Sequence, residues 1–104
     1  MTAGRDPVAV AALQYCAAGT AEETLRTLMP LIDRAADDGA KLVCLPEAAT
    51  FLAASRAALA DEAEPAGESP VLDRLCNAAA RRGIELSIGS MFFLGPDGRH
   101  VNQH

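Results

Sequence analysis

Glu47 is the residue of this chain whose type and position best fit chemistry. It follows the apolar residues 42–45 and then Pro46. The proline favours extended geometry at Leu45 and ends strand pairing, so the carboxylate is expected at the carboxyl end of a strand, where ligands of parallel sheets bind. A carboxylate at this edge could act as a general base or bind a cation. The plainer interpretation is a solvated loop glutamate.

Three cysteines and one lysine are the candidate partners of Glu47 in nucleophilic catalysis. Lys41 lies six residues before Glu47 on an extended segment, roughly 20 Å away at about 3.3 Å per residue. Cys44 points to the opposite face of the same strand, and Cys76 falls on the apolar stripe of a predicted helix, so both are expected to be small buried hydrophobes. Cys16 could approach Glu47 from a neighbouring strand, but it has no histidine or lysine nearby to activate its thiol.

The histidines and the acidic residues do not form a convincing metal site. His100 and His104 lie two pleats apart on a predicted strand, where they are expected to be exposed or at a sheet edge. A group of four carboxylates surrounds a loop that contains proline and glycine, and it is expected to be a solvated surface. Its members are Asp61, Glu62, Glu64 and Glu68.

The first half of the chain has the pattern of a βαβ unit. Residues 8–16 are mostly apolar, as in a strand buried on both faces of a sheet. Thr20 and Glu23 fit a capping box at the start of a helix, and Gly39 supplies its end. Residues 41–46 predict a second buried strand, and a helical crossover of this length favours parallel pairing. The helix is expected to bury one stripe, formed by Leu25, Leu28, Met29, Ile32, Ala35 and Ala36. Pro30 removes one backbone donor and is expected to bend the helix axis near Arg26.

The second half predicts two helices and a hairpin. An alanine-rich helix is expected over residues 48–63, followed by a polar loop over 64–68. Ser69 and Pro70 begin a further helix that Gly83 closes. Residues 84–88 alternate like a strand, and residues 91–94 lead through a turn into a return strand over 99–104. Because a natural domain seldom ends inside a half-built hairpin, we expect a truncated domain over residues 7–104 after a disordered segment 1–6.

Composition and charge exclude several classes of function. The 104 residues carry 9 Lys and Arg against 14 Asp and Glu, a net charge of −5, with no basic cluster that could neutralise phosphates. Nucleic acid is therefore not an expected partner, and no apolar run approaches the roughly 20 residues of a membrane span. The 3 cysteines fit neither a disulfide framework nor a metal motif, which favours a reducing, cytoplasmic location.

The hydrophobic strand that runs into Leu45-Pro46-Glu47 resembles the glutamate motif of the nitrilase superfamily of carbon–nitrogen hydrolases. The likeness extends over nearly all of residues 7–103. Further matching elements occur in the family's order: Leu13-Gln14, Gly39-Ala40, Glu64-Pro65, Gly67, Leu72, Leu75, Ala79, Gly83-Ile84, Ile88-Gly89-Ser90, Asp97-Gly98 and Asn102.

The resemblance implies the amino-terminal half of an α-β-β-α sandwich that hydrolyses small amides, nitriles or carbamoyl compounds with a glutamate, a lysine and a cysteine. Glu47 takes the place of the glutamate, while the family's lysine and cysteine fall beyond His104. The 104-residue chain alone is therefore expected to be inactive. The resemblance implies no metal and no organic cofactor. The family usually dimerises, so a homo-oligomer is one expectation.

Two other classes of protein compete with a hydrolase. One is a small non-catalytic α/β binding or regulatory domain in which Glu47 marks a ligand crevice, although residues 16–19 supply neither a glycine-rich phosphate loop nor an acidic cluster. The other is a non-catalytic subunit that pairs with full-length relatives. The ordered set of matches favours the hydrolase.

Overall fold

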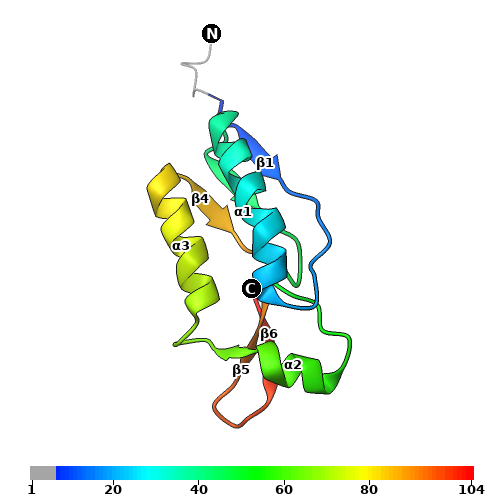
Figure 1. The fold of residues 1–104 in the computed structure, drawn as a ribbon. Coiled ribbons are helices and arrows are strands. Elements are labelled where there is room, and N and C mark those ends of the chain that lie inside the picture. Colours follow the sequence, from blue (N-terminus) through cyan, green and yellow to red (C-terminus); the bar gives the residue numbers. More distant parts are fainter. Residues whose placement is uncertain (1–6) are drawn as a thin grey trace.

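The structure is a computed structural model that describes residues 7–104, so the disorder predicted for residues 1–6 lies outside the described residues. Three helices occur in the described range (Figure 1): α1 (Ala21–Asp37), α2 (Arg56–Glu62) and α3 (Pro70–Arg82). The first sheet contains β1 (Val10–Ala12), β2 (Leu42–Cys44) and β4 (Glu85–Ser87). The second contains β3 (Glu64–Pro65), β5 (Met91–Leu94) and β6 (His100–Gln103). The mixed α/β class is confirmed.

The first sheet is parallel throughout, with β2 in the centre. Val43 of β2 is in register with Ala11 of β1 and with Leu86 of β4. The predicted βαβ unit is therefore confirmed, although both of its strands are shorter than expected. Pairing stops soon after Cys44 because Pro46 has no N–H to donate.

Side chains at their ends explain where α1 and α3 begin and stop. The Thr20 hydroxyl accepts a hydrogen bond from the Glu23 N–H at 3.3 Å, as predicted for the start of α1. The Ser69 hydroxyl accepts one from the Leu72 N–H at 3.1 Å. Gly83 ends α3 in the left-handed conformation, with φ of 63°, which favours glycine.

The cap of α3 gives a prediction about stability. Ser69 is buried and its hydroxyl also donates to Glu64 Oε1 at 2.8 Å, so Ser69→Ala should lower the free energy of unfolding by about 1–2 kcal/mol. Ser55 caps the exposed start of α2 with a single bond to the Ala58 N–H. Ser55→Ala should therefore lower the free energy of unfolding by less than Ser69→Ala does, with both variants measured by urea unfolding. An equal loss in both variants would contradict this account of the cap.

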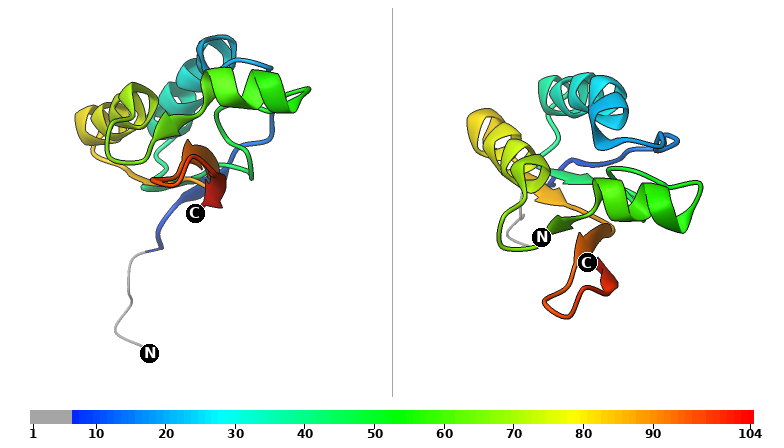
Figure 2. Two further views of the ribbon diagram at one scale, coloured as in Figure 1. Left: turned by 90° about the horizontal axis from the view of Figure 1, so that it is seen from below. Right: turned by 60° about the horizontal axis from the view of Figure 1, so that its bottom comes forward.

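Helices α1 and α3 lie side by side on one face of the first sheet (Figure 2). The stripe predicted for α1 provides most of this core, with Leu28 and Ile32 fully buried, and Val43 and Leu75 close it from β2 and α3. Within the described residues the opposite face of β1 is uncovered, and Val10 is 58% exposed. The prediction that this strand is buried on both faces was wrong, because the second layer that would cover it does not occur there.

The helix predicted over residues 48–63 was wrong for its first half. Residues 48–55 are irregular, and Ala49, Thr50 and Phe51 are buried within them. Only α2 forms, because tertiary hydrogen bonds take the amides of the earlier residues away from helical pairing. Alanine has the highest helix propensity, but propensities differ by less than about 1 kcal/mol per ordinary residue, so such tertiary contacts override them.

The second sheet joins the hairpin to a strand that the sequence did not predict. Strands β5 and β6 pair antiparallel with Phe93 opposite Val101, which confirms the hairpin. The expected polar loop after α2 contains β3, whose Glu64 pairs in parallel with Phe93. Among residues 7–104, none of the helices is long and apolar enough to cross a membrane.

Candidate active site around Glu47

Glu47 lies shortly after β2, at the edge of the first sheet where the parallel strands end. It belongs to a loop formed by residues 45–49, which we name the Glu47 loop. The Glu47 side chain is exposed, and in the described part of the chain it makes no hydrogen bond. The carboxylate is thus free to meet a partner, while the main chain that carries it is fixed by its neighbours.

A second segment, residues 87–90, holds the Glu47 loop from the side, and we name it the clamp segment. The Leu45 N–H donates to the Ser87 carbonyl at 2.8 Å. Beyond Glu47, the Ala48 N–H donates to Ser90 Oγ at 2.9 Å and the Ala49 N–H donates to the Ser90 carbonyl at 2.8 Å. Hydrogen bonds therefore fix the main chain on both sides of Glu47, from a segment about forty residues later in the sequence.

Gly89 lets the clamp segment approach the Glu47 loop closely. A Cβ atom built on Gly89 would lie 2.5 Å from both the carbonyl carbon and the carbonyl oxygen of Pro46, and 2.6 Å from the carbonyl oxygen of Leu45. All three atoms belong to the backbone, so no side chain can turn aside. Glycine is required at this position for close backbone approach.

The Glu47 loop also contains a strained residue. Ala48 has a φ of 48°, in the left-handed region that costs a residue with a Cβ roughly 1–2 kcal/mol. The bond from its N–H to Ser90 Oγ, and the bond from the next amide to the Ser90 carbonyl, compensate for this conformation. Backbone strain of this kind often occurs at functional sites, and in this loop it sets the direction in which the chain leaves Glu47.

Tyr15 holds the Glu47 loop from a third element, the segment that follows β1. Its hydroxyl donates to the Ala49 carbonyl at 2.6 Å. Burial raises the pKa of Tyr15 from 10.0 to about 12. Sequence reasoning did not identify this residue, although it is the only tyrosine and lies at the end of the first predicted strand.

The raised pKa of Tyr15 predicts a loss of stability in alkali. Because the folded state holds the phenol proton more tightly than the unfolded state, the stabilisation is complete below pH 10 and disappears as pH rises towards 12. Tyr15→Phe should remove this alkaline decline, and at neutral pH it should lower the free energy of unfolding by about 1 kcal/mol. With 1 Tyr and 0 Trp, phenolate absorbance reports this group alone. If the phenolate absorbance of Tyr15 rises at the same pH in buffer and in denaturant, the prediction is contradicted.

Lys41 lies far from Glu47, as its place on the strand predicts, and the three cysteines differ in exposure. Lys41 lies at the opposite end of β2, where its backbone pairs with Ala9 and Glu85. Cys16 is exposed and Cys44 is half-buried. The prediction that Cys76 is buried was wrong: α3 turns Leu75 and Ala78 towards the core, which leaves Cys76 exposed.

Two of the four carboxylates around the loop before α3 accept hydrogen bonds that hold the fold. The Ala21 N–H at the start of α1 donates to Glu62 Oε2 at 3.1 Å, and Glu64 accepts from Ser69. Asp61 and Glu68 are exposed, as predicted. Across the described range, no group of three or more His, Cys, Asp or Glu side chains is arranged to hold a metal ion.

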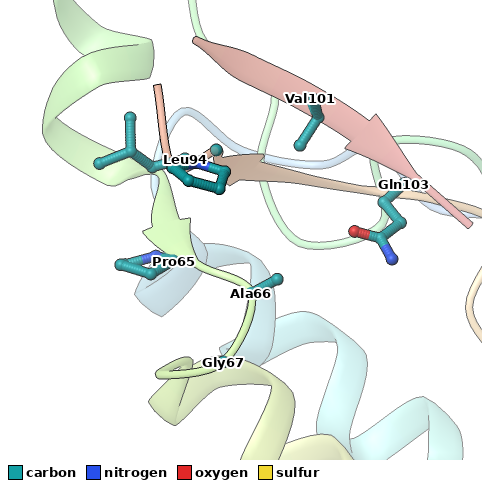
Figure 3. Close-up of a pocket in the computed structure, with 8 residues that line it drawn as sticks. Pro65, Ala66, Gly67, Leu94, Val101 and Gln103 are labelled. Carbon is teal, nitrogen blue, oxygen red and sulfur yellow. The ribbon is translucent and has the colours of Figure 1, made fainter. Parts of the chain in front are cut away.

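An apolar pocket of about 420 Å³ lies away from Glu47, between the loop after β3 and the hairpin (Figure 3). Pro65 and Leu94 are paired neighbours on β3 and β5 and line one side with Ala66 and Gly67, while Val101 and Gln103 line the pocket from β6. Neither the Glu47 loop nor the clamp segment contributes to it, and its lining contains no titratable side chain. It therefore offers shape and apolar surface but no groups for acid–base chemistry.

Comparison with known proteins agrees with this arrangement. The sequence model of the carbon–nitrogen hydrolase family matches residues 8–103. The chain belongs to this family. The crystal structure of the C. elegans NitFhit protein is similar to this carbon–nitrogen hydrolase chain with a TM-score of 0.77 and 21% sequence identity. The match covers 89% of this chain and 24% of the NitFhit chain, so this chain spans about a quarter of that protein's length. The predicted resemblance and the nitrilase-like fold are confirmed.

Proposed function

We propose that this chain supplies the general base of a hydrolase that cleaves non-peptide carbon–nitrogen bonds in small amides, nitriles or carbamoyl compounds, and that Glu47 is that base. The observation that supports the proposal is the construction of the Glu47 loop. Its backbone is held by Ser87, Ser90 and Tyr15, whereas the carboxylate is exposed and has no hydrogen-bond partner among the described residues. A group that must give and receive protons needs a fixed backbone and a free carboxylate.

In the proposed reaction, Glu47 takes the proton of a cysteine thiol as its sulfur attacks the electrophilic carbon of the substrate. A lysine stabilises the negative charge of the tetrahedral intermediate. For an amide, the carbon–nitrogen bond breaks, the nitrogen leaves as ammonia or an amine with the proton from Glu47, and a thioester remains. Glu47 then removes a proton from water, which attacks the thioester and releases the acid and the thiol. The family resemblance supplies the cysteine and the lysine, and no residue of 1–104 matches their positions.

A comparison of two polypeptides tests the proposed reaction. The first is the 104-residue chain, which should release no more ammonia than buffer from a panel of one amide, one nitrile and one carbamoyl compound. The second continues through the reading frame after His104 and should hydrolyse at least one member of the panel. A frame that encodes no lysine and cysteine after His104 would contradict the proposal. Turnover by the 104-residue chain that Cys16→Ala abolishes would instead make Cys16 the nucleophile.

The location and assembly of the protein belong to the same proposal. We place it in the cytoplasm, which its three free cysteines support, since a reducing compartment keeps thiols unpaired. Assembly into a homo-oligomer and completion of the α-β-β-α sandwich follow from the family. Light scattering of the longer polypeptide would test the assembly, and a monomer would contradict it.

A further inference from the structure

His104 contacts the clamp segment at Gly89. Its Nδ1 atom lies 2.6 Å from the carbonyl oxygen of Gly89. A carbonyl oxygen carries no hydrogen, so Nδ1 must be the donor in this bond and must hold a proton. The residue also lines a small cavity of about 150 Å³, whose apolar wall is formed by Leu72, Ile88, Met91 and Phe93.

Gly89 is the point at which this contact can affect Glu47. The Gly89 backbone lies so close to Pro46 that no Cβ atom fits between them. The carbonyl of the same residue meets the imidazole of His104. The next residue, Ser90, accepts both amide hydrogen bonds from Ala48 and Ala49. A displacement of Gly89 would therefore move the groups that fix the Glu47 loop.

We propose that His104 is a positioning residue for Glu47. Its Nδ1–H donates to the Gly89 carbonyl, holds the clamp segment against the Glu47 loop and thereby keeps Ser90 in place for the two amides after Glu47. The role rests on the proposed function only in that Glu47 is the residue to be positioned. Glycine has no Cβ, so its backbone has more conformational freedom than that of other residues. A hydrogen bond from His104 to the Gly89 carbonyl would restrict this freedom.

His100 offers a comparison from β6, the strand that His104 follows. It lies at the start of β6, and its Nε2 atom is buried without a hydrogen-bond partner among the residues that the structure describes. Both residues are histidines near the carboxyl end of the chain, but within residues 7–104 only the His104 imidazole makes a hydrogen bond to the clamp segment. Substitution of His100 therefore controls for the loss of an imidazole from this region.

Nitrogen-15 NMR of the imidazole rings in the unsubstituted 104-residue chain tests the donor directly. At a pH where the ring is neutral, His104 should carry its proton on Nδ1, whereas a freely solvated histidine favours the Nε2–H form. Detection of the Nε2–H form at His104 would overturn the proposal. This measurement needs no variant and no catalytic activity, so a failure of the proposed hydrolysis does not affect it.

Amide hydrogen exchange tests the consequence for the Glu47 loop. His104→Leu should make the amides of Ala48 and Ala49 exchange about tenfold faster, while the amides in the middle of α1 stay unchanged. His104→Asn, whose amide can still donate to a carbonyl, should restore part of the protection. The control His100→Leu should leave both amides unchanged. Equal exchange in His104→Leu and the unsubstituted chain, or a uniform increase that includes α1, would overturn the positioning role.

Discussion

Gly89→Ala should lower the free energy of unfolding by about 3–5 kcal/mol, one of the two largest effects we expect in this chain. The new methyl group would lie 2.5 Å from backbone atoms of Pro46, so either the Glu47 loop or the clamp segment has to move. Such a movement breaks the hydrogen bonds that Ser90 accepts from Ala48 and Ala49. Urea unfolding followed by circular dichroism would measure the loss.

Gly67→Ala is the matched control for this substitution. Gly67 has no atom within 4 Å of a built Cβ and does not adopt a positive φ, so alanine should fit and change stability by less than about 0.5 kcal/mol. The entropy of the unfolded chain falls on Gly→Ala and would by itself stabilise both variants, so an equal loss of stability in both would mean that an added methyl group is tolerated no better at Gly67 than at Gly89. The close approach of the clamp segment to Pro46 would then not explain the role of Gly89.

In the polypeptide that we propose hydrolyses the substrate panel, Glu47→Gln should lower kcat by about a thousandfold and leave the free energy of unfolding unchanged. Glutamine has nearly the shape of glutamate but cannot accept the proton that the thiol and the attacking water must lose, and general-base catalysis contributes typically about 10²–10⁴-fold. The side chain is exposed and makes no hydrogen bond within the described residues, so its replacement removes no contact that holds the fold. Steady-state kinetics and thermal unfolding of the same preparation would give both values.

Glu68→Gln controls for the loss of a surface carboxylate. Glu68 is exposed in the loop before α3 and should keep full activity after substitution. A Glu47→Gln variant that retains more than a tenth of the original kcat would contradict the role of Glu47 as base. A large loss of stability in that variant would instead show that the side chain holds the fold.

Local chemistry made α1 and α3 predictable. Thr20 and Ser69 accept hydrogen bonds from amides three residues later, and Gly83 ends α3 through its own backbone freedom. Information of this kind lies entirely within a short window of sequence. The parallel pairing of β1 with β2 also followed, because a helical crossover between two apolar segments has few alternatives.

The errors occurred where distant residues decide the local structure. Residues 48–55 have the composition of a helix, but Ser90 binds the amides of Ala48 and Ala49. Strand β3 likewise depends on pairing with β5, which follows it by a whole helix. Cys76 was misplaced because apolar spacing on a short helix leaves its rotation uncertain by about one residue.

The candidate site was predictable only in part for the same reason. Pro46 after an apolar strand was enough to place Glu47 at the end of β2. The residues that hold its loop come from separate segments, and a single tyrosine, glycine or serine carries no signal of such a contact. The stretch Ile88-Gly89-Ser90 was noticed only through the family resemblance, and its clamping contacts with Pro46 and Ala48 required the structure.

The backbone around Glu47 is fixed by hydrogen bonds, while its carboxylate is free of them within the described residues. Nitrogen-15 relaxation of the Glu47, Ala48 and Ala49 amides in the 104-residue chain measures this most directly. We predict order parameters near about 0.85, equal to those of the β2 amides, which are typical of a rigid backbone. Values below about 0.6 at these three amides, with β2 still rigid, would show a flexible loop and contradict the account.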